Sequence, residues 1–120
     1  MSKYFSENEI ACKCGCGLVI HNAQLESIMD AIREEYGLAL IANSWTRCPD
    51  NNAAEPDAKP DSAHLKGMAV DIRVLDSPMR YDILKIIFRR DDINRVGIAR
   101  TFIHIDIDTS KPQEVVWLYG

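Results

Sequence analysis

The sequence lacks an excess of basic residues. Its 120 residues include 14 Lys and Arg against 18 Asp and Glu, which gives a formal net charge of −4 at pH 7. Proteins that bind nucleic acid or an anionic membrane by electrostatic attraction carry a basic surface. The charge balance therefore argues against both as partners.

Long hydrophobic segments are also lacking. No stretch stays apolar for the ~20 residues that a membrane-spanning helix needs. The first ten residues, MSKYFSENEI, do not have the apolar centre of a secretory signal peptide. We therefore expect a protein without a membrane span that is made in the cytoplasm.

The chain has no internal repeat, no low-complexity tract and no long linker. Hydrophobic residues make up 47% and charged residues 27% of the sequence, which is the composition of an ordinary globular protein. A chain of this length is expected to form one domain over residues 1–120. The expected oligomeric state is a monomer.

Two helices are predicted from hydrophobic spacing. Apolar residues recur at helical intervals within 22–36, with Asn22 as the N-cap and Gly37 as the stop. A second helix is expected over 77–90, with Pro78 in its first turn.

Short apolar or alternating segments predict the strands. We expect strands over 38–44, 68–74, 95–99, 102–108 and 115–119. Residues 48–61 are rich in Pro, Asn and Asp and predict a surface loop. The expected fold class is α+β, a small antiparallel sheet with helices packed on one face.

Two of the three histidines lie in segments that suggest a metal site. In SAHLKGMAVDI, residues 62–72, His64 precedes Asp71 by seven residues. Gly67 lets the chain reverse into the strand that carries Asp71, which then projects back toward His64.

The strand FIHIDID, residues 102–108, alternates strictly. Its isoleucines share one face, so His104, Asp106 and Asp108 share the other. This polar face indicates either a site in a cleft or an exposed edge of the sheet, and Asp108 is expected to be a loop or surface acid.

Together the two segments supply a zinc ligand set. Catalytic zinc is usually bound by three His, Cys, Asp or Glu side chains, with a fourth position left open. His64, Asp71 and His104 would provide them. A zinc ion there would make water more acidic and polarise a carbonyl group, so that a peptide bond could be attacked without a protein nucleophile.

The motifs resemble a known family of peptidases. The pattern SxHxxGxAxD at 62–71 and FIHID at 102–106 resemble the zinc D-Ala-D-Ala carboxypeptidase and L-alanyl-D-glutamate endopeptidase family, whose relatives include hedgehog-type domains. FSENEIACKCGCG, SWTRCPDNN and VVWLY look like the short phage and bacterial members, so the resemblance covers nearly the whole chain.

The resemblance implies roles for individual residues. His64, Asp71 and His104 match the zinc ligands. Arg47 matches an arginine that steadies the oxyanion on the substrate carbonyl, and a guanidinium offers suitable donors; the alternative is a surface arginine in a loop. Ser62 is expected to bind substrate or to cap the turn that carries His64.

The general base departs from the family pattern. Many relatives place an acid three residues before the last histidine, where this chain has Thr101. Asp106 is the best replacement, because it lies on the same face as His104 and a carboxylate can accept a proton from water. Its alternative role is to orient His104.

The loop between Arg47 and the zinc motif also departs from the family. Relatives usually have a Gly-Gly pair where this chain has AAEPDAKPD, residues 53–61. This difference alters a wall of the expected cleft, so an intact set of zinc ligands does not by itself decide the substrate preference.

The four cysteines leave three interpretations open. Cys12, Cys14, Cys16 and Cys48 could hold a second, structural zinc ion, although CxCxC lacks the two-residue spacing of zinc knuckles. They could be free thiols, or the first cluster could form a bridge to Cys48 if the protein acts outside a cell.

The resemblance implies a zinc peptidase acting on the stem peptides of peptidoglycan, of D-Ala-D-Ala carboxypeptidase or L-Ala-D-Glu endopeptidase type. A phage endolysin would fit, and the protein is then expected to reach the cell wall by release or delivery. The rival hypotheses are a noncatalytic zinc-containing module that binds the cell wall and a structural module of a virion.

Overall fold

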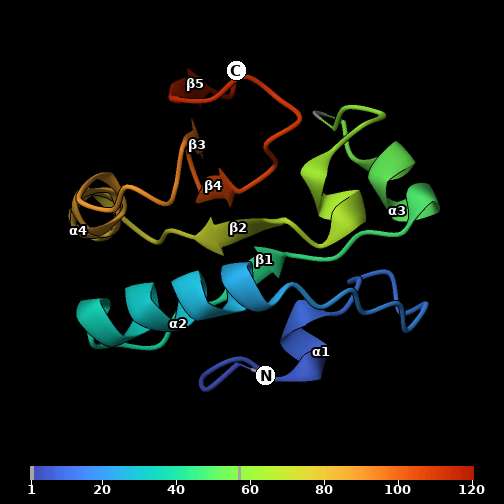
Figure 1. Ribbon diagram of the computed structural model, residues 1–120, viewed down its shortest axis with the longest axis horizontal. Coiled ribbons are helices and arrows are strands. Elements are labelled where there is room, and N and C mark those ends of the chain that lie inside the picture. The colour runs from blue at the N-terminus through green and yellow to red at the C-terminus, as the bar shows by residue number, and fades with distance from the viewer. Residues whose placement is uncertain (1, 57) are drawn as a thin grey trace.

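The computed structural model describes residues 2–56 and 58–120 and shows an α+β fold, as predicted (Figure 1). The helices are α1 (Glu7–Ile10), α2 (Ala23–Tyr36), α3 (Pro49–Ala54), the 3₁₀ helix η1 (Ala63–Lys66) and α4 (Ser77–Phe88). The strands are β1 (Ala42–Ser44), β2 (Ala69–Arg73), β3 (Arg95–Ile98), β4 (Phe102–Asp106) and β5 (Val115–Leu118).

The five strands form one mostly antiparallel sheet in the order β1-β2-β4-β3-β5. The exception to the predicted antiparallel pairing is β5, which runs parallel to β3. Both edges of β4 are already paired, with β2 and β3. The chain after β4 crosses to the remaining edge of β3. Because β5 runs opposite to β4, and β3 also runs opposite to β4, β5 is parallel to β3.

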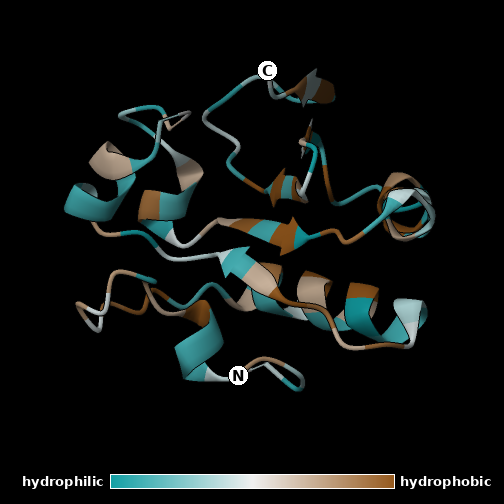
Figure 2. Ribbon diagram, turned by 180° about the vertical axis from the view of Figure 1, so that it is seen from behind, coloured by the Kyte–Doolittle hydropathy of each residue, from teal (hydrophilic) through white to brown (hydrophobic). Residues whose placement is uncertain are grey.

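The apolar face of the sheet packs against α2 and α4. Asn22 accepts a hydrogen bond from the backbone N–H of Leu25 at 2.9 Å and caps α2, which ends at Gly37 in a left-handed conformation, as predicted. Hydrophobic and hydrophilic residues alternate along α2 in Figure 2. The core members of the two helices and the two central strands are Leu25, Ile28, Met29, Ile32, Ile83, Ile86, Ile87, Val70, Ile72, Ile103 and Ile105.

The predicted strand over 38–44 is shorter than expected, since only Ala42–Ser44 forms β1. Leu38 and Ile41 are exposed, so the apolar residues after α2 are not all core residues. Pairing with β2 is also irregular between Ala42 and Ser44. The alanines of this segment favour a strand only weakly.

The predicted loop over 48–61 contains the short helix α3. Cys48 is its N-cap and Pro49 occupies its first turn, a position where proline loses no helical hydrogen bond. Asp57, which the predicted loop includes, lies outside the described residues, as does Met1. Among the described residues, no helix is long and apolar enough to cross a membrane.

Helix α1 was not predicted from hydrophobic spacing. Ser6 and Glu9 form a capping box at its start, in which each side chain bonds the backbone N–H of the other residue. The S-x-x-E spacing is the sequence signal that could have revealed this helix.

Strand register brings the polar residues of the sheet together. Asp71 of β2 lies opposite His104 of β4, and on its other side His104 lies opposite Gly97 of β3. The same β3/β4 ladder places Arg95 opposite Asp106. Alternation along these strands then directs the polar side chains away from the apolar core.

Candidate metal centre

The polar face of β2 and β4 forms the floor of a cleft of about 630 Å³. All the site residues expected from the sequence line this cleft, namely Arg47, Ser62, His64, Asp71, His104 and Asp106. Residues far apart in the sequence thus share one surface, and the polar face of 102–106 is not an exposed sheet edge.

His64 is held by η1 with its imidazole almost fully buried. Its Nδ1 lies 2.7 Å from the carbonyl oxygen of Trp45, and its Nε2 lies 3.2 Å from Oδ1 of Asp71. A carbonyl oxygen only accepts hydrogen bonds, so Nδ1 carries the proton. In a neutral ring, the lone pair of Nε2 then faces the carboxylate.

His104 contacts a carboxylate with each ring nitrogen. Its Nε2 lies 2.7 Å from Oδ2 of Asp106, and its Nδ1 lies 2.8 Å from Oδ1 of Asp71. A neutral imidazole has only one N–H. When Nε2 donates to Asp106, the lone pair of Nδ1 faces the same Asp71 oxygen that His64 faces.

This arrangement fits a bound cation. Three electron-pair donors converge, His64 Nε2, His104 Nδ1 and Asp71 Oδ1, and they lie within 4.8 Å of one another. Ligands bound at ~2.0 to 2.2 Å around a tetrahedral zinc ion are separated by about 3.4 Å, close to the observed contacts of 2.8 and 3.2 Å with Asp71. The three side chains therefore match a metal site in donor type and spacing.

The pKa of Asp71 is lowered and that of His104 is raised in the folded protein. Burial alone would raise the pKa of Asp71, but its contacts with the imidazoles of His104 and His64 outweigh burial and hold that pKa below its usual range. Burial alone would lower the pKa of His104, but the bonds to Asp106 and Asp71 raise it. Positive charge beside the ionised Asp71, from a protonated ring or from a cation, would therefore be stabilising.

Arg47 is buried beside the three candidate metal ligands and is not a surface arginine. Its Nη2 donates to Oδ2 of Asp71 at 3.1 Å, its Nε to Ser44 at 2.9 Å, and its Nη1 to Asn52 at 3.2 Å. These bonds leave two of the five guanidinium N–H groups for a ligand in the cleft. The backbone N–H of Arg47 also donates to the carbonyl of His64 at 3.0 Å.

Ser62 caps η1, because its hydroxyl accepts a hydrogen bond from the backbone N–H of His64 at 3.3 Å. The left-handed Gly67, with φ of 68°, ends this helix and turns the chain into β2. A Cβ at Gly67 would lie 2.5 Å from the carbonyl oxygen of Ile20. The S-x-H-x-x-G spacing is thus the local structure that holds His64 in place.

Sequence reasoning missed Arg95 and Trp117. Arg95 donates through Nε to Oδ1 of Asp106 at 2.7 Å, and its guanidinium lies 5.0 Å from the centre of the Trp117 ring. Trp117 in turn lies 5.3 Å from the ring of His104. The tight β3/β4 hairpin was the available signal for Arg95, since a short turn places Arg95 opposite Asp106.

Asp108 differs from the surface acid expected. It follows the end of β4, but its carboxylate is buried and pairs with Lys66 at 2.9 Å and Lys111 at 2.7 Å. Burial on its own would raise the pKa of Asp108, but Lys111, Ser110 and Lys66 together hold it below its usual range. Asp108 thus ties η1 to the segment after β4.

Comparison with known proteins identifies the family. No curated protein and no solved structure matches the chain. The model of the Peptidase M15 family matches residues 3–108, which include Arg47, Ser62, His64, Asp71, His104 and Asp106. The chain therefore belongs to the Peptidase M15 family of metallopeptidases.

Proposed function

We propose that this chain is a zinc-dependent peptidase that hydrolyses peptide bonds in peptidoglycan. The observation that carries the proposal is the convergence of His64, Asp71 and His104 on the floor of a cleft, beside a guanidinium with free donors. Two imidazoles and one carboxylate are a donor set typical of catalytic zinc, and they leave one coordination position open.

His64, Asp71 and His104 would hold the ion. When bound, zinc supplies an electrophilic centre that polarises the scissile carbonyl and makes water a stronger acid. Trp45 and Asp106 hold the two imidazoles from behind through their hydrogen bonds at 2.7 Å, and such contacts set the orientation and basicity of ligand rings.

Arg47 and Ser62 are proposed to contact substrate. The two remaining N–H groups of Arg47 can stabilise the oxygen of the scissile carbonyl as it gains negative charge. Because Asp71 fixes one side of the guanidinium, these donors need little reorganisation. Ser62 lines the same cleft, and its hydroxyl proton is available to a substrate while its oxygen caps η1.

Asp106 has two proposed roles, as the proton acceptor for water and as the residue that orients His104. Its Oδ2 contacts Nε2 of His104, and its Oδ1 accepts from Arg95. The backbone N–H of Asp108 also donates to Oδ1, at 3.2 Å. Both carboxylate oxygens of Asp106 are thus already engaged, which favours the supporting role. The general-base role stays a prediction.

The substrate is proposed to be a stem peptide of the cell wall. Such peptides carry free carboxylates, and the cationic residues Lys59 and Arg95 line the cleft with the aromatic side chains Phe102, Trp117 and Tyr119. Two bonds stay open, the terminal D-Ala-D-Ala bond and the internal L-Ala-D-Glu bond.

The test is incubation of the zinc-loaded protein with purified peptidoglycan. We expect new amino groups, and mass spectrometry distinguishes free D-alanine from peptides with a new amino-terminal D-glutamate. The double variant His64→Ala/His104→Ala is the matched inactive control. Absence of hydrolysis by a protein that carries zinc would contradict the proposal.

A noncatalytic module that binds the cell wall is the second candidate. The observation that favours it is Thr101, because the acid that many relatives have at this position is missing. Cosedimentation with peptidoglycan without release of amino groups would support this candidate. Adding the protein to intact bacteria from outside tests the phage-type delivery expected from the sequence, since lysis requires access to the wall.

A further inference from the structure

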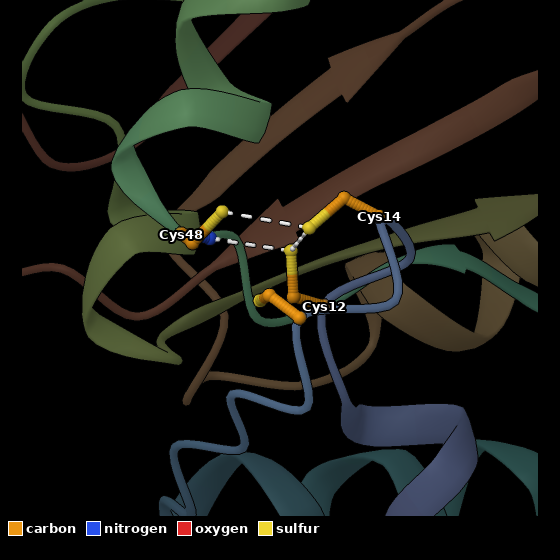
Figure 3. A group of neighbouring side chains, drawn as sticks. Cys12, Cys14 and Cys48 are labelled. Carbon is orange, nitrogen blue, oxygen red and sulfur yellow. Dashed lines mark hydrogen bonds between the residues drawn. The ribbon is translucent and has the colours of Figure 1, made fainter.

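All four cysteines converge outside the cleft. Cys12, Cys14 and Cys16 follow α1, while Cys48 directly precedes α3. Their sulfur atoms lie within 4.8 Å of one another, and all four thiols are free. Figure 3 shows Cys14 and Cys12 pointing toward Cys48 across the gap between the two segments.

The sulfur spacing matches a tetrahedral metal site. The Sγ atoms of Cys12 and Cys14 are 3.4 Å apart, and those of Cys14 and Cys48 are 3.6 Å apart. Four sulfurs bound to zinc at about 2.3 Å would be separated by about 3.8 Å. The observed contacts need only a small expansion to accept an ion.

Nearby N–H groups stabilise negative charge on the sulfurs. The backbone N–H of Cys48 and the side-chain amide of Asn51 both donate to Sγ of Cys12 at 3.3 Å. The backbone N–H of Asn51 also donates to Sγ of Cys48 at 3.4 Å. Hydrogen bonds to a charged acceptor favour the thiolate, which is the form that binds metal.

The loop conformation supports the same interpretation. Gly15 and Gly17 have φ values of 87° and 85°, a left-handed conformation that allows three alternating cysteines to turn toward one point. This turn explains how CxCxC can supply three ligands without the two-residue spacing of zinc knuckles.

We propose that Cys12, Cys14, Cys16 and Cys48 bind a second metal ion, a structural zinc held by four thiolates. Thiolate ligands in a tetrahedral set favour zinc over hard cations such as magnesium or calcium. Each thiol releases its proton on binding, and a site with four protein ligands has no open position for a substrate.

The second ion would fasten the wall of the cleft. Cys48 follows Arg47 directly. Thr46, which precedes Arg47, donates its backbone N–H to the carbonyl oxygen of Ile10 at 3.0 Å. The Thr46 hydroxyl accepts from the N–H of Ile20 at 3.1 Å. A zinc bridge from the 12–16 loop to Cys48 therefore restrains the segment that positions Arg47.

The test measures zinc in the full chain, purified and zinc-loaded under reducing conditions. We expect elemental mass spectrometry to find two zinc ions per wild-type chain. The variant Cys14→Ser/Cys16→Ser should bind one, and since both thiols are exposed, the substitutions leave the core unchanged. The variant His64→Ala/His104→Ala should also bind one.

X-ray absorption assigns the ligands of the ion that remains. In His64→Ala/His104→Ala we expect a shell of sulfur at about 2.3 Å, and in Cys14→Ser/Cys16→Ser a shell of nitrogen and oxygen. Cobalt loading of the histidine variant should give a thiolate-to-metal charge-transfer band. Asn51→Ala, which removes a donor to Cys12 but no ligand, is the matched control and should keep its zinc.

Three results would overturn the second site. The first is equal zinc content in the wild type and in Cys14→Ser/Cys16→Ser. The second is rapid reaction of all four thiols with a thiol reagent in the zinc-loaded protein. The third is a decrease in the mass of the intact chain that shows disulfide formation. Failure of the proposed peptidase site would instead leave one sulfur-bound zinc in the wild type, so the two proposals are tested separately.

Discussion

At the residue scale, we propose two tasks for Arg47, holding Asp71 and stabilising the substrate carbonyl, which can be separated experimentally. It holds Oδ2 of Asp71 at 3.1 Å and retains free donors toward the cleft. A donor aimed at the carbonyl oxygen matters most in the transition state, where negative charge develops. The distinction between holding Asp71 and stabilising the substrate therefore appears in kinetics and metal content.

Replacing Arg47 with alanine should reduce turnover by about 10² to 10³. Arg47→Lys should recover only part of the rate, because an ammonium keeps the charge but loses the planar fork. Zinc content should change little in either variant. Arg73→Ala is the matched control, since Arg73 is exposed and bonds Asn43. An unchanged rate in Arg47→Ala would remove this residue from the mechanism.

Asp106 is a second residue whose two roles predict different outcomes. If it supports His104, Asp106→Asn should weaken zinc binding by about 10- to 100-fold. If it is the general base, zinc should stay bound while turnover falls by roughly 10² or more. The contact of Oδ2 with Nε2 at 2.7 Å leads us to expect the first result.

Zinc affinity and turnover of Asp106→Asn should be measured on the same preparation. Glu55→Gln is the control, because Glu55 is a carboxylate that lines the same cleft. A variant with wild-type affinity and wild-type turnover would contradict both roles.

At the scale of elements, Asp108 connects η1 to the segment that follows β4. Its folded-state pKa is below the value of about 4 expected for an unfolded chain. The ionised carboxylate therefore contributes stability that is fully present above this value and is lost as the pH falls through the folded-state pKa.

Asp108→Asn should lower the free energy of unfolding at pH 7 by about 2 kcal/mol, because Lys66 and Lys111 lose a charged partner. The difference from the wild type should shrink below about pH 4. Urea unfolding at pH 7 and at pH 3 measures both effects. Asp82→Asn, at an exposed position of α4, is the control, and an equal loss at both pH values would contradict the assignment.

Strand β5 forms a wall of the site because β3 has a glycine at the contact. A Cβ on Gly97 would lie 2.6 Å from Nε1 of Trp117 and 2.7 Å from the ring of Tyr119. The missing side chain lets Trp117 lie against His104. The shape of this wall thus depends on one small residue in the neighbouring strand.

Gly97→Ala should displace Trp117 and destabilise the protein by about 1 to 3 kcal/mol through overpacking. We expect altered tryptophan fluorescence and weaker substrate binding, with zinc content unchanged. Gly120→Ala is the matched control, because a Cβ there meets nothing within 4 Å. Unchanged fluorescence and unchanged stability in Gly97→Ala would contradict this account of the wall.

At the scale of the whole molecule, a metal bound only by the folded state should stabilise it. His64 and Asp71 flank the turn from η1 into β2, whereas His104 comes from β4. Zinc at 1,000 times its dissociation constant would add about 4 kcal/mol to the free energy of unfolding. An ion at this site would thus couple elements that are distant in the sequence.

Chelation should lower the melting temperature of the Cys14→Ser/Cys16→Ser variant, which isolates the histidine site, and added zinc should restore it. The shift should vanish when His64→Ala and His104→Ala are added to the same chain. Calorimetry with and without chelator measures the melting temperatures of both variants. A shift that persists without the two histidines would place the stabilising ion elsewhere.

The sequence by itself determined the elements and residues that depend on local patterns. Helix α2 follows from hydrophobic spacing with Asn22 and Gly37 at its ends, and the alternation of 102–106 separates His104 and Asp106 from the core isoleucines. The Ser62 cap and Gly67 turn also act within a few residues. Local geometry is repeated at fixed intervals, so a pattern can predict it.

Only the tertiary structure decided which distant residues meet. Strand order left β5 the free edge of β3 and so placed Trp117 beside His104. The packing of the segment after β4 buried Asp108 between two lysines, and the fold brought Cys48 to the 12–16 loop. Such contacts depend on strand register and on which edges stay unpaired, and these are properties of the whole sheet that no single segment encodes.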